Sequence, residues 1–275
     1  MGKKTIVLMS DLHCGALSGI TPPAYQIHYN KEVESNQAKF WNWYSETLKM
    51  LKPDIVCVIG DAIDGRNRKS GGIGCITSDL FEQAAMATEA LSVANAGKYY
   101  FIRGTDYHVA QDGTEIENLI AHNFDATIEN RLYLSVQGSN YKEEDETTHC
   151  FKKVFDLKHK VGHSTTPYGM FTPQAKEATW NLEWFMEGAR PNADYFIRGH
   201  VHRFSYAGTS RFLAINLPAL QLPLYNTFGD KCCSNVVDVG MVVFEFDSET
   251  AILNRWEPVL YGGYNYKAKV VTEAL

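Results

Sequence analysis

The sequence predicts an α/β protein built around a parallel β-sheet, and three observations support this class. Short apolar runs rich in β-branched residues occur at 5–10 and 54–59, and such runs are typical of strands buried on both faces. A segment with helical spacing of its apolar residues, 36–51, separates them. Each run ends in Gly or Asp. A strand, a helix and a strand in this order form a βαβ unit, which requires parallel pairing.

The remaining elements follow in the same order along the chain. In the first helix, Phe40, Tyr44 and Leu48 recur at spacings near one helical turn, and Pro53 ends the segment. The later predictions are a helix over 79–96, a strand over 98–103, a helix over 112–123, strands within 126–163 interrupted by an acidic turn at 142–146, a helix over 173–188, and strands over 193–198 and 236–246. No linker or repeat period marks a second domain, so residues 1–275 are predicted to form one domain.

Composition and charge exclude several classes of protein. Hydrophobic residues make up 45% and charged residues 21% of the 275 residues, which is typical of a folded globular chain and not of a disordered one. The formal charge of −6 argues against a broadly basic surface that binds nucleic acid, but it does not exclude a local basic groove. There is no apolar run of about 20 residues and no signal-peptide pattern at the start. Six cysteines without a C-x-x-C pair indicate a reducing compartment, so we expect a cytoplasmic protein without a membrane partner.

Histidine and aspartate residues gather where the predicted strands end. They are Asp11 and His13, Asp61 and Asp64, Asp106 and His108, His163, and His200 and His202. One such pair is ordinary turn chemistry, but five sets in order at strand ends are not explained by turns. Strand ends are where open α/β sheets bind ligands, and buried carboxylates and imidazoles need partners. The other histidines, His28, His122, His149 and His159, lack such a motif and are interpreted as surface or core residues.

The spacing of these residues predicts a metal site. In the pairs Asp11 with His13 and His200 with His202, the two side chains lie on the same side of an extended segment, so each pair can offer two ligands. Mixed imidazole and carboxylate ligands favour manganese, iron, zinc or cobalt, with nickel also compatible, over magnesium or calcium. The set exceeds the needs of one ion and fits two divalent transition metal ions about 3.5–4 Å apart. Such a pair is typical of hydrolases.

Five ordered blocks within residues 5 to about 205 resemble a known family. They are Asp11-Leu12-His13, Gly60-Asp61-Ala62-Ile63-Asp64, Gly104-Thr105-Asp106-Tyr107-His108, Gly162-His163 and Gly199-His200-Val201-His202. These blocks resemble the D-x-H, G-D-x-x-D, G-N-H, G-H and G-H-x-H motifs of the calcineurin-like metallophosphoesterases. The resemblance implies a four-layer α/β/β/α sandwich, with two central mixed β-sheets flanked by helices, and a dimetal site at the strand ends.

The resemblance also implies a role for each residue. Asp11, His13 and His202 would hold the first metal, Asp61 would bridge, and His163 and His200 would hold the second. The third block departs from the family pattern, because Thr105-Asp106-Tyr107 stands where an Asn directly precedes the His. Either Asp106 or Thr105 replaces that Asn, or the second metal keeps an extra water; Asp106 is included among the candidate ligands. His108 would be the residue that protonates the leaving group, and a hydrogen bond to Asp64 would orient it. The Gly-Thr-x-x-His form resembles phage-encoded members.

The function that follows is hydrolysis of a phosphodiester, in a nucleotide or nucleic acid, by a hydroxide that bridges two metals. Two alternatives stay open: a phosphomonoesterase, and a metal-stabilised binding protein with weak catalysis on the same fold. A basic, glycine-rich loop begins after Asp64. Its Arg66 and Arg68 are candidate substrate-binding residues that would clamp a phosphate, although a solvated loop has the same composition.

Overall fold

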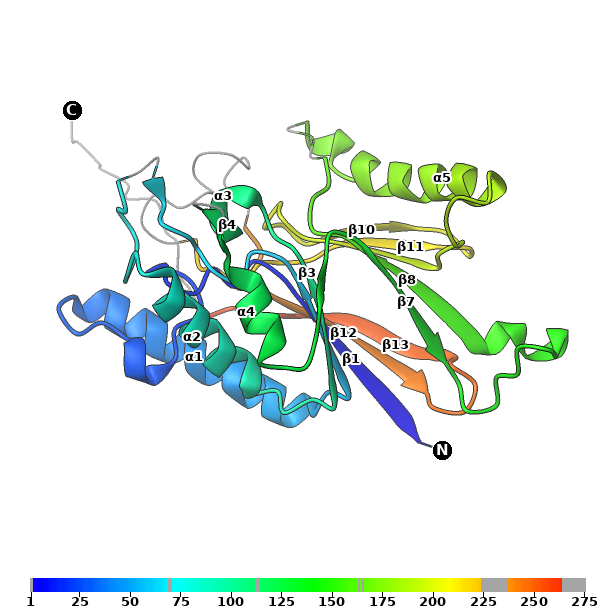
Figure 1. The fold of residues 1–275 in the computed structure, drawn as a ribbon, viewed down its shortest axis with the longest axis horizontal. Coiled ribbons are helices and arrows are strands. Elements are labelled where there is room, and N and C mark those ends of the chain that lie inside the picture. The colour runs from blue at the N-terminus through cyan, green and yellow to red at the C-terminus, as the bar shows by residue number, and fades with distance from the viewer. Residues whose placement is uncertain are drawn as a thin grey trace, which may run out of the picture.

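The computed structural model describes residues 2–68, 71–111, 114–162, 164, 166–223 and 237–263. Its strands form two sheets and a small hairpin (Figure 1). The first sheet contains, in spatial order, β13 (Leu253–Leu260), β12 (Gly240–Asp247), β1 (Lys3–Met9), β2 (Ile55–Ile59), β3 (Lys98–Ile102) and β6 (Ile128–Glu129). The second contains β10 (Ser205–Gly208), β11 (Leu213–Asn216), β9 (Tyr195–Arg198), β8 (Lys152–Leu157) and β7 (Leu132–Gln137). The hairpin pairs β4 (Ala110–Gln111) with β5 (Thr114–Glu115).

The helices are α1 (Lys31–Leu51), α2 (Leu80–Ser92), α3 (Asp106–Val109), α4 (Ile116–His122) and α5 (Thr172–Met186), with short 3-10 turns at Pro23–Tyr25, Glu146–Phe151 and Pro167–Gly169. Both sheets are mixed. In the first, β1, β2, β3 and β6 run parallel, and β12 and β13 add antiparallel strands at one edge. In the second, β8, β9 and β11 run parallel between two antiparallel strands, β7 and β10.

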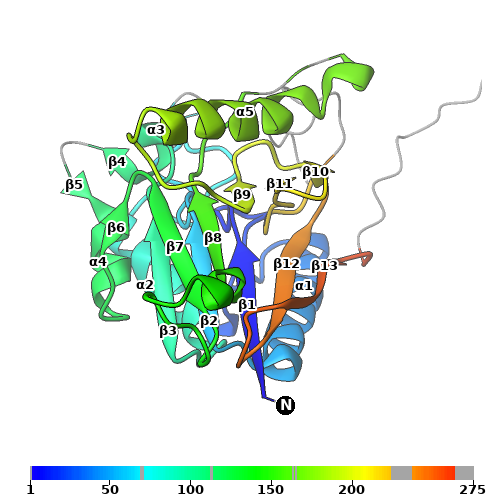
Figure 2. The same ribbon diagram turned by 90° about the vertical axis from the view of Figure 1, so that its right-hand side faces the viewer.

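Strand β1 shows why the chain folds into four layers. Successive side chains of a strand point to opposite faces, and here both faces are buried. Val7 and Met9 belong to a core that includes residues of α1, α2 and α4, whereas Ile6 and Leu8 belong to a core shared with the second sheet. Helix α5 covers the outer face of the second sheet, and α1, α2 and α4 cover that of the first (Figures 1 and 2). The predicted α/β/β/α sandwich with two mixed sheets is confirmed.

Three predicted helix boundaries are wrong. The helix predicted over 79–96 ends at Ser92, and the other two differ for a local reason. Helix α1 begins at Lys31 and not at residue 36, because the Asn30 side chain caps it by accepting hydrogen bonds from two backbone N–H groups of the first turn. The helix predicted over 112–123 begins at Ile116, because the chain before it pairs as the β4–β5 hairpin. Residues Asp106–Val109 form the short helix α3.

A buried ionic network links the second sheet to α5. The Arg198 side chain is fully buried, and its guanidinium donates to the Asp156 carboxylate at 3.0 Å and to Glu177 of α5 at 2.6 Å. Arg131 also binds both oxygens of Asp156, through Nε at 2.8 Å and through a guanidinium NH₂ group. Arg198 therefore anchors α5 against β9, the strand that leads to His200.

Asp156→Asn is expected to lower the free energy of unfolding by about 3–5 kcal/mol, because it removes the buried carboxylate that pairs with both Arg131 and Arg198 and leaves Arg198 with Glu177 alone. Burial raises the pKa of Asp156, but Arg131 and Arg198 outweigh it and lower the pKa below its ordinary value. A depressed carboxyl pKa gives stability that is present above the unfolded pKa and is lost as pH falls through the folded pKa. Urea unfolding should therefore show a difference at about pH 7 that shrinks below about pH 3.9. Glu257→Gln, which alters only an exposed ion pair, is the control; a difference that persists in acid would contradict the account.

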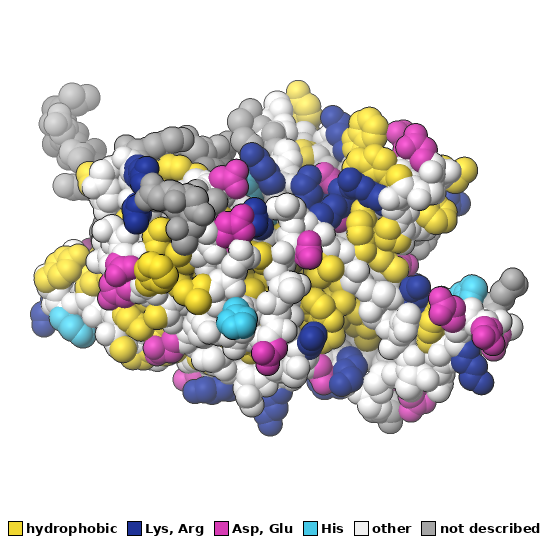
Figure 3. All heavy atoms as spheres, viewed as in Figure 1, with side chains coloured by type: hydrophobic (Ala, Val, Ile, Leu, Met, Phe, Trp, Pro, Cys, Tyr) yellow, Lys and Arg dark blue, Asp and Glu magenta, His cyan; other side chains and the backbone are white. Residues whose placement is uncertain are grey.

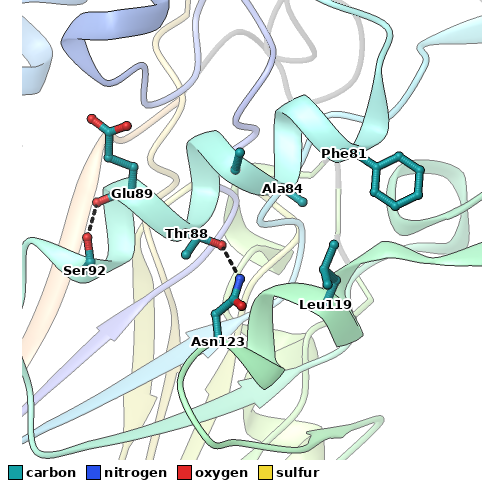
Figure 4. A pocket seen from close by; sticks show the side chains of 8 residues that line it. Phe81, Ala84, Thr88, Glu89, Ser92, Leu119 and Asn123 are labelled. Atoms are coloured by element: carbon teal, nitrogen blue, oxygen red, sulfur yellow. Dashed lines mark hydrogen bonds between the residues drawn. The ribbon is translucent and has the colours of Figure 1, made fainter.

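The described residues of α2 and α4 form a hollow away from the strand ends. A cavity of about 380 Å³ lies between α2 and α4, and Figure 4 shows its lining side chains. Asn123 donates to the Thr88 hydroxyl across it, and the exposed Phe81 lies at its other end. No histidine or aspartate lines it. On the face in Figure 3, basic and acidic side chains are intermingled. Within the described ranges, no helix has the length and apolar character needed to cross a membrane.

Candidate metal centre

The candidate site lies where the carboxyl ends of strands from both sheets meet. Asp11 and Asp61 follow β1 and β2 of the first sheet, and His159 and His200 follow β8 and β9 of the second. Each of the four stands two residues beyond the end of its strand. Because parallel strands of a sheet end at the same edge, this common offset brings the four side chains to one place.

Glycines allow the loops to approach closely enough for these side chains to meet. A Cβ on Gly104 would lie 2.2 Å from Oδ1 of Asp61, which is far closer than any atoms can pack. Gly60 has a φ of +79°, and a Cβ there would lie 2.5 Å from Nδ1 of His159. Contact alone therefore requires glycine at position 104, and contact together with backbone conformation requires it at position 60.

The first group of candidate ligands contains Asp11, His13 and His202, all of them buried. The two Nε2 atoms lie 3.3 Å apart, and Oδ1 of Asp11 lies 3.1 Å from Nε2 of His202 and 3.9 Å from that of His13. Two imidazole nitrogens and one carboxylate oxygen thus converge on a single point. Lone pairs aimed at one another in a buried place need a cation or protons between them.

The second group contains Asp61, His159 and His200, whose ligand atoms lie within 4.8 Å of one another. Oδ2 of Asp61 lies 3.1 Å from Nε2 of His159. That nitrogen is buried and has no well-aligned hydrogen bond within the described residues, which leaves it available as a ligand. It also lies 4.0 Å from Oδ1 of Asp11, so the two groups are adjacent.

Hydrogen bonds behind the ligands fix which atoms face the site. Nδ1 of His159 lies 2.6 Å from the carbonyl oxygen of Ile59. A carbonyl can only accept, so Nδ1 holds the proton and Nε2 presents its lone pair. Nδ1 of His13 lies 3.0 Å from the Asp64 carboxylate, which fixes that ring in the same way. Metal-bound histidines generally donate their second N–H to a carbonyl or carboxylate, so these residues fit a divalent metal ion.

Asp11 is oriented by the same kind of support. Its Oδ2 accepts hydrogen bonds from the Ser10 hydroxyl at 2.5 Å and from the His200 backbone N–H at 3.0 Å. Its Oδ1 is left facing His202. Support from a hydroxyl and a backbone group keeps one carboxylate oxygen in place while the other stays available to a cation.

The electrostatics of the second group show strong coupling between its acid and base. Burial raises the pKa of Asp61, but the charge of the neighbouring His159 outweighs this effect and lowers the pKa well below its ordinary value. Burial lowers the pKa of His159, but Asp61 and Asp11 raise it to about 10. Burial and the charge of His159 lower the pKa of His200 to about 4. A cation that binds here must displace the proton on His159, so binding releases protons and strengthens with rising pH.

Five candidate ligands adopt the left-handed backbone conformation, which is uncommon for residues other than glycine. They are Asp11, His13, Asp61, His200 and His202, with φ between 45° and 72°. Each such residue costs about 1–3 kcal/mol. Backbone hydrogen bonds from Asp11 to Gly60 and from His13 to Asp61 hold these loops in place despite the cost. Strain of this kind concentrates at functional sites.

The structure brings together most of the residues predicted from the motifs. Six of them, Asp11, His13, Asp61, Asp64, His200 and His202, converge at this edge, and His108 joins His13 and Asp64 in a third group. The prediction for His163 lies outside the described residues. Arg66 is half-buried and Arg68 exposed on the loop after Asp64, whose base is held by bonds between Gly65 and the buried Gln83 side chain.

Asp106 lies apart from the candidate groups. Its side chain is exposed at the start of α3 and belongs to none of the candidate groups among the described residues. Thr105 faces the site in its place. The Thr105 backbone N–H donates to Oδ1 of Asp61 at 2.6 Å, and its hydroxyl lies 3.0 and 3.1 Å from the two carboxylate oxygens. Thr105 therefore orients Asp61 from behind.

The predicted hydrogen bond between Asp64 and His108 is present, and it involves the main chain of Asp64. Nδ1 of His108 donates to the backbone carbonyl of Asp64 at 2.6 Å and lies 3.9 Å from its carboxylate. The carboxylate instead orients His13. Asp64 thus fixes two histidines, one through its side chain and one through its main chain. The His108 side chain is 21% exposed, so it can meet a bound molecule.

Sequence reasoning missed His159, which was interpreted as an ordinary histidine. The structure places it against Asp61 in the second group. No glycine precedes it, so it lacks the motif that identified the other candidates. One signal was available: like Asp11, Asp61 and His200, it stands two residues beyond an apolar strand. That offset identifies it once the end of β8 is placed at Leu157.

No protein-family model matches the sequence, and no curated protein sequence matches it. Comparison with solved structures finds an archaeal phosphodiesterase with 14% identity and a TM-score of 0.45, over 94% of this chain and 99% of that one. It also finds Vps29 from Entamoeba histolytica in complex with zinc, with 12% identity and a TM-score of 0.41 over 93% and 98% of the chains. A predicted phosphoesterase from Streptococcus pneumoniae has 13% identity and a TM-score of 0.34 over 95% and 99%.

The two mixed sheets flanked by helices decide the fold. The fold is consistent with the calcineurin-like sandwich. This agrees with the resemblance of the motifs, since Asp11, Asp61 and His200 also lie at strand ends, where that resemblance places them. The phage-type resemblance stays a prediction.

Proposed function

We propose that the protein is a metal-dependent phosphoesterase that hydrolyses a phosphodiester in a nucleotide or nucleic acid. The observation that supports this is the pair of adjacent, buried groups, Asp11 with His13 and His202, and Asp61 with His159 and His200. Their ligand atoms converge from loops that follow strands of both sheets, and hydrogen bonds at Nδ1 of His13 and of His159 turn the Nε2 atoms of these two rings toward the site. Mixed imidazole and carboxylate ligands suit manganese, iron, zinc, cobalt or nickel, with manganese proposed first.

In this proposal each group would hold one divalent ion, and Asp61 would be the ligand shared between the two. When bound, the ions would supply an activated water and positive charge for the phosphoryl oxygens. His108 would serve as the general acid: its Nδ1–H is fixed on the Asp64 carbonyl, which leaves Nε2 to pass a proton to the leaving oxygen. Arg66 and Arg68 would bind phosphate groups of the substrate.

The proposed function is tested with bis-p-nitrophenyl phosphate and p-nitrophenyl phosphate, using metal-free and manganese-loaded protein. We expect turnover of the diester only after loading. His108→Ala should lower kcat about 10²- to 10⁴-fold, because general-acid catalysis contributes about that much. His122→Ala, which removes an exposed histidine of α4, is the matched control. Turnover of the monoester alone would favour a phosphatase. Two bound metals without turnover of either ester would favour a binding protein.

A further inference from the structure

Glu117 is a buried acid that the proposed chemistry does not use. It lies in the first turn of α4 and is 3% exposed. Acids are almost never this buried unless they are paired, yet no Lys or Arg forms an ion pair with Glu117 among the described residues. The cost is visible in its pKa, which burial and the neighbouring Asp61 raise to about 7. A residue that is expensive to bury needs a specific reason to be there.

The partners of Glu117 are two backbone N–H groups at the metal centre. Its Oε1 accepts from Ala62 at 2.8 Å, and its Oε2 accepts from Gly104 at 2.8 Å. Ala62 directly follows Asp61, and Gly104 directly precedes Thr105. The pairing of β2 with β3 ends at Ile59 and Ile102, so both N–H groups lie beyond the last rung of the ladder. The carboxyl group thus replaces the sheet hydrogen bonds that these N–H groups lack.

These contacts close a ring around Asp61. Glu117 joins Ala62 to Gly104, and Thr105, next to Gly104, donates to the Asp61 carboxylate through both its N–H and its hydroxyl. The same carboxylate places Oδ2 at 3.1 Å from Nε2 of His159. A shift of one loop against the other would therefore move Asp61 away from His159 or from Thr105.

We propose that Glu117 is a positioning residue for the second metal, joining the two loops so that Asp61 keeps the orientation the metal requires. This inference rests on the proposed function, since it assigns a support to the same centre. Glu117 acts through Asp61 and Thr105 and does not touch substrate. Two acceptor oxygens are needed, one for each N–H. Glutamine supplies one acceptor and turns an NH₂ group toward the other N–H, and aspartate is too short to span both.

The test compares manganese binding and kinetics in the full-length wild type, Glu117→Gln and Glu117→Asp. We expect both variants to bind the second manganese equivalent about 10- to 100-fold more weakly, because loss of an outer-shell partner typically has that effect. The first equivalent should bind as in the wild type. At saturating manganese, KM for the ester should be unchanged and kcat should recover toward the wild-type value. One variant keeps the side-chain length and the other shortens it, so the test still works if one of the two fails to fold.

Glu115→Gln is the matched control, because Glu115 precedes the same helix and makes only exposed bonds to Arg103 and Asn118. Wild-type affinity for both equivalents in folded Glu117 variants would overturn the inference, as would equal weakening of both equivalents together with a lower unfolding midpoint. The readout is metal binding, so it stays separate from the proposed function. If the wild type binds two manganese ions but hydrolyses neither ester, the proposed function is contradicted and the inference about Glu117 is not.

Discussion

Asp61→Asn is expected to remove one of two metal equivalents and to lower kcat/KM for the diester by at least about 10³-fold. The carboxylate oxygen at 3.1 Å from His159 supplies the negative charge of the second group, and an amide does not replace that charge. Loss of one cation removes several kcal/mol of charge stabilisation in the transition state, and each 1.36 kcal/mol corresponds to about tenfold in rate. Metal analysis and steady-state kinetics on the same preparation measure both effects.

The Asp61→Asn protein should still fold. Asp61 has a φ of 51°, and asparagine is among the residues that tolerate this left-handed conformation. Asp125→Asn is a close control, because Asp125 has a φ of 50° but is exposed and belongs to no candidate metal group. A variant that keeps both metals and wild-type turnover would contradict the assignment of Asp61 as a ligand.

His159→Gln is expected to weaken binding of the second metal at least about 10²-fold and to reduce turnover at limiting metal in proportion. Outer-shell partners alone contribute about 10- to 100-fold, and His159 is placed as a ligand itself. Glutamine fills most of the space and can donate to the Ile59 carbonyl, but it lacks the imidazole lone pair that transition metals favour. Calorimetric titration of metal-free protein with manganese measures the affinity of each site.

A His163→Gln variant tests whether His163, predicted from the motif, or His159, placed by the structure, is the histidine that the second metal needs. The motifs predict His163 as a ligand of the second metal, whereas the structure places His159 beside Asp61. We expect the His163 variant to retain both equivalents. Loss of an equivalent in the His163 variant, with full binding in the His159 variant, would restore the motif-based assignment and reject the geometric one.

Local patterns in the sequence predicted the strands, because alternation and Gly or Asp at a strand end depend on neighbouring residues only. The same signals found Asp11, Asp61 and His200. His159 escaped because its role arises from the parallel pairing of β8 with β9, which no local motif records. Asp106 lies outside the candidate groups because it stands at the exposed start of α3, a short helix that the sequence did not predict. Glu117 stands in no motif, since its partners are main-chain groups brought near by two other strands.

At five candidate ligands, the left-handed backbone lowers the stability of the fold while the side chains supply the candidate site. The folded state bears that conformational cost whether or not a cation is bound, and glycine or asparagine at the same positions would reduce it. Substitution by glycine or asparagine would therefore give a more stable sandwich with an intact core, but without the candidate ligands. Asp and His at these five positions thus carry a conformational cost that the fold itself does not require.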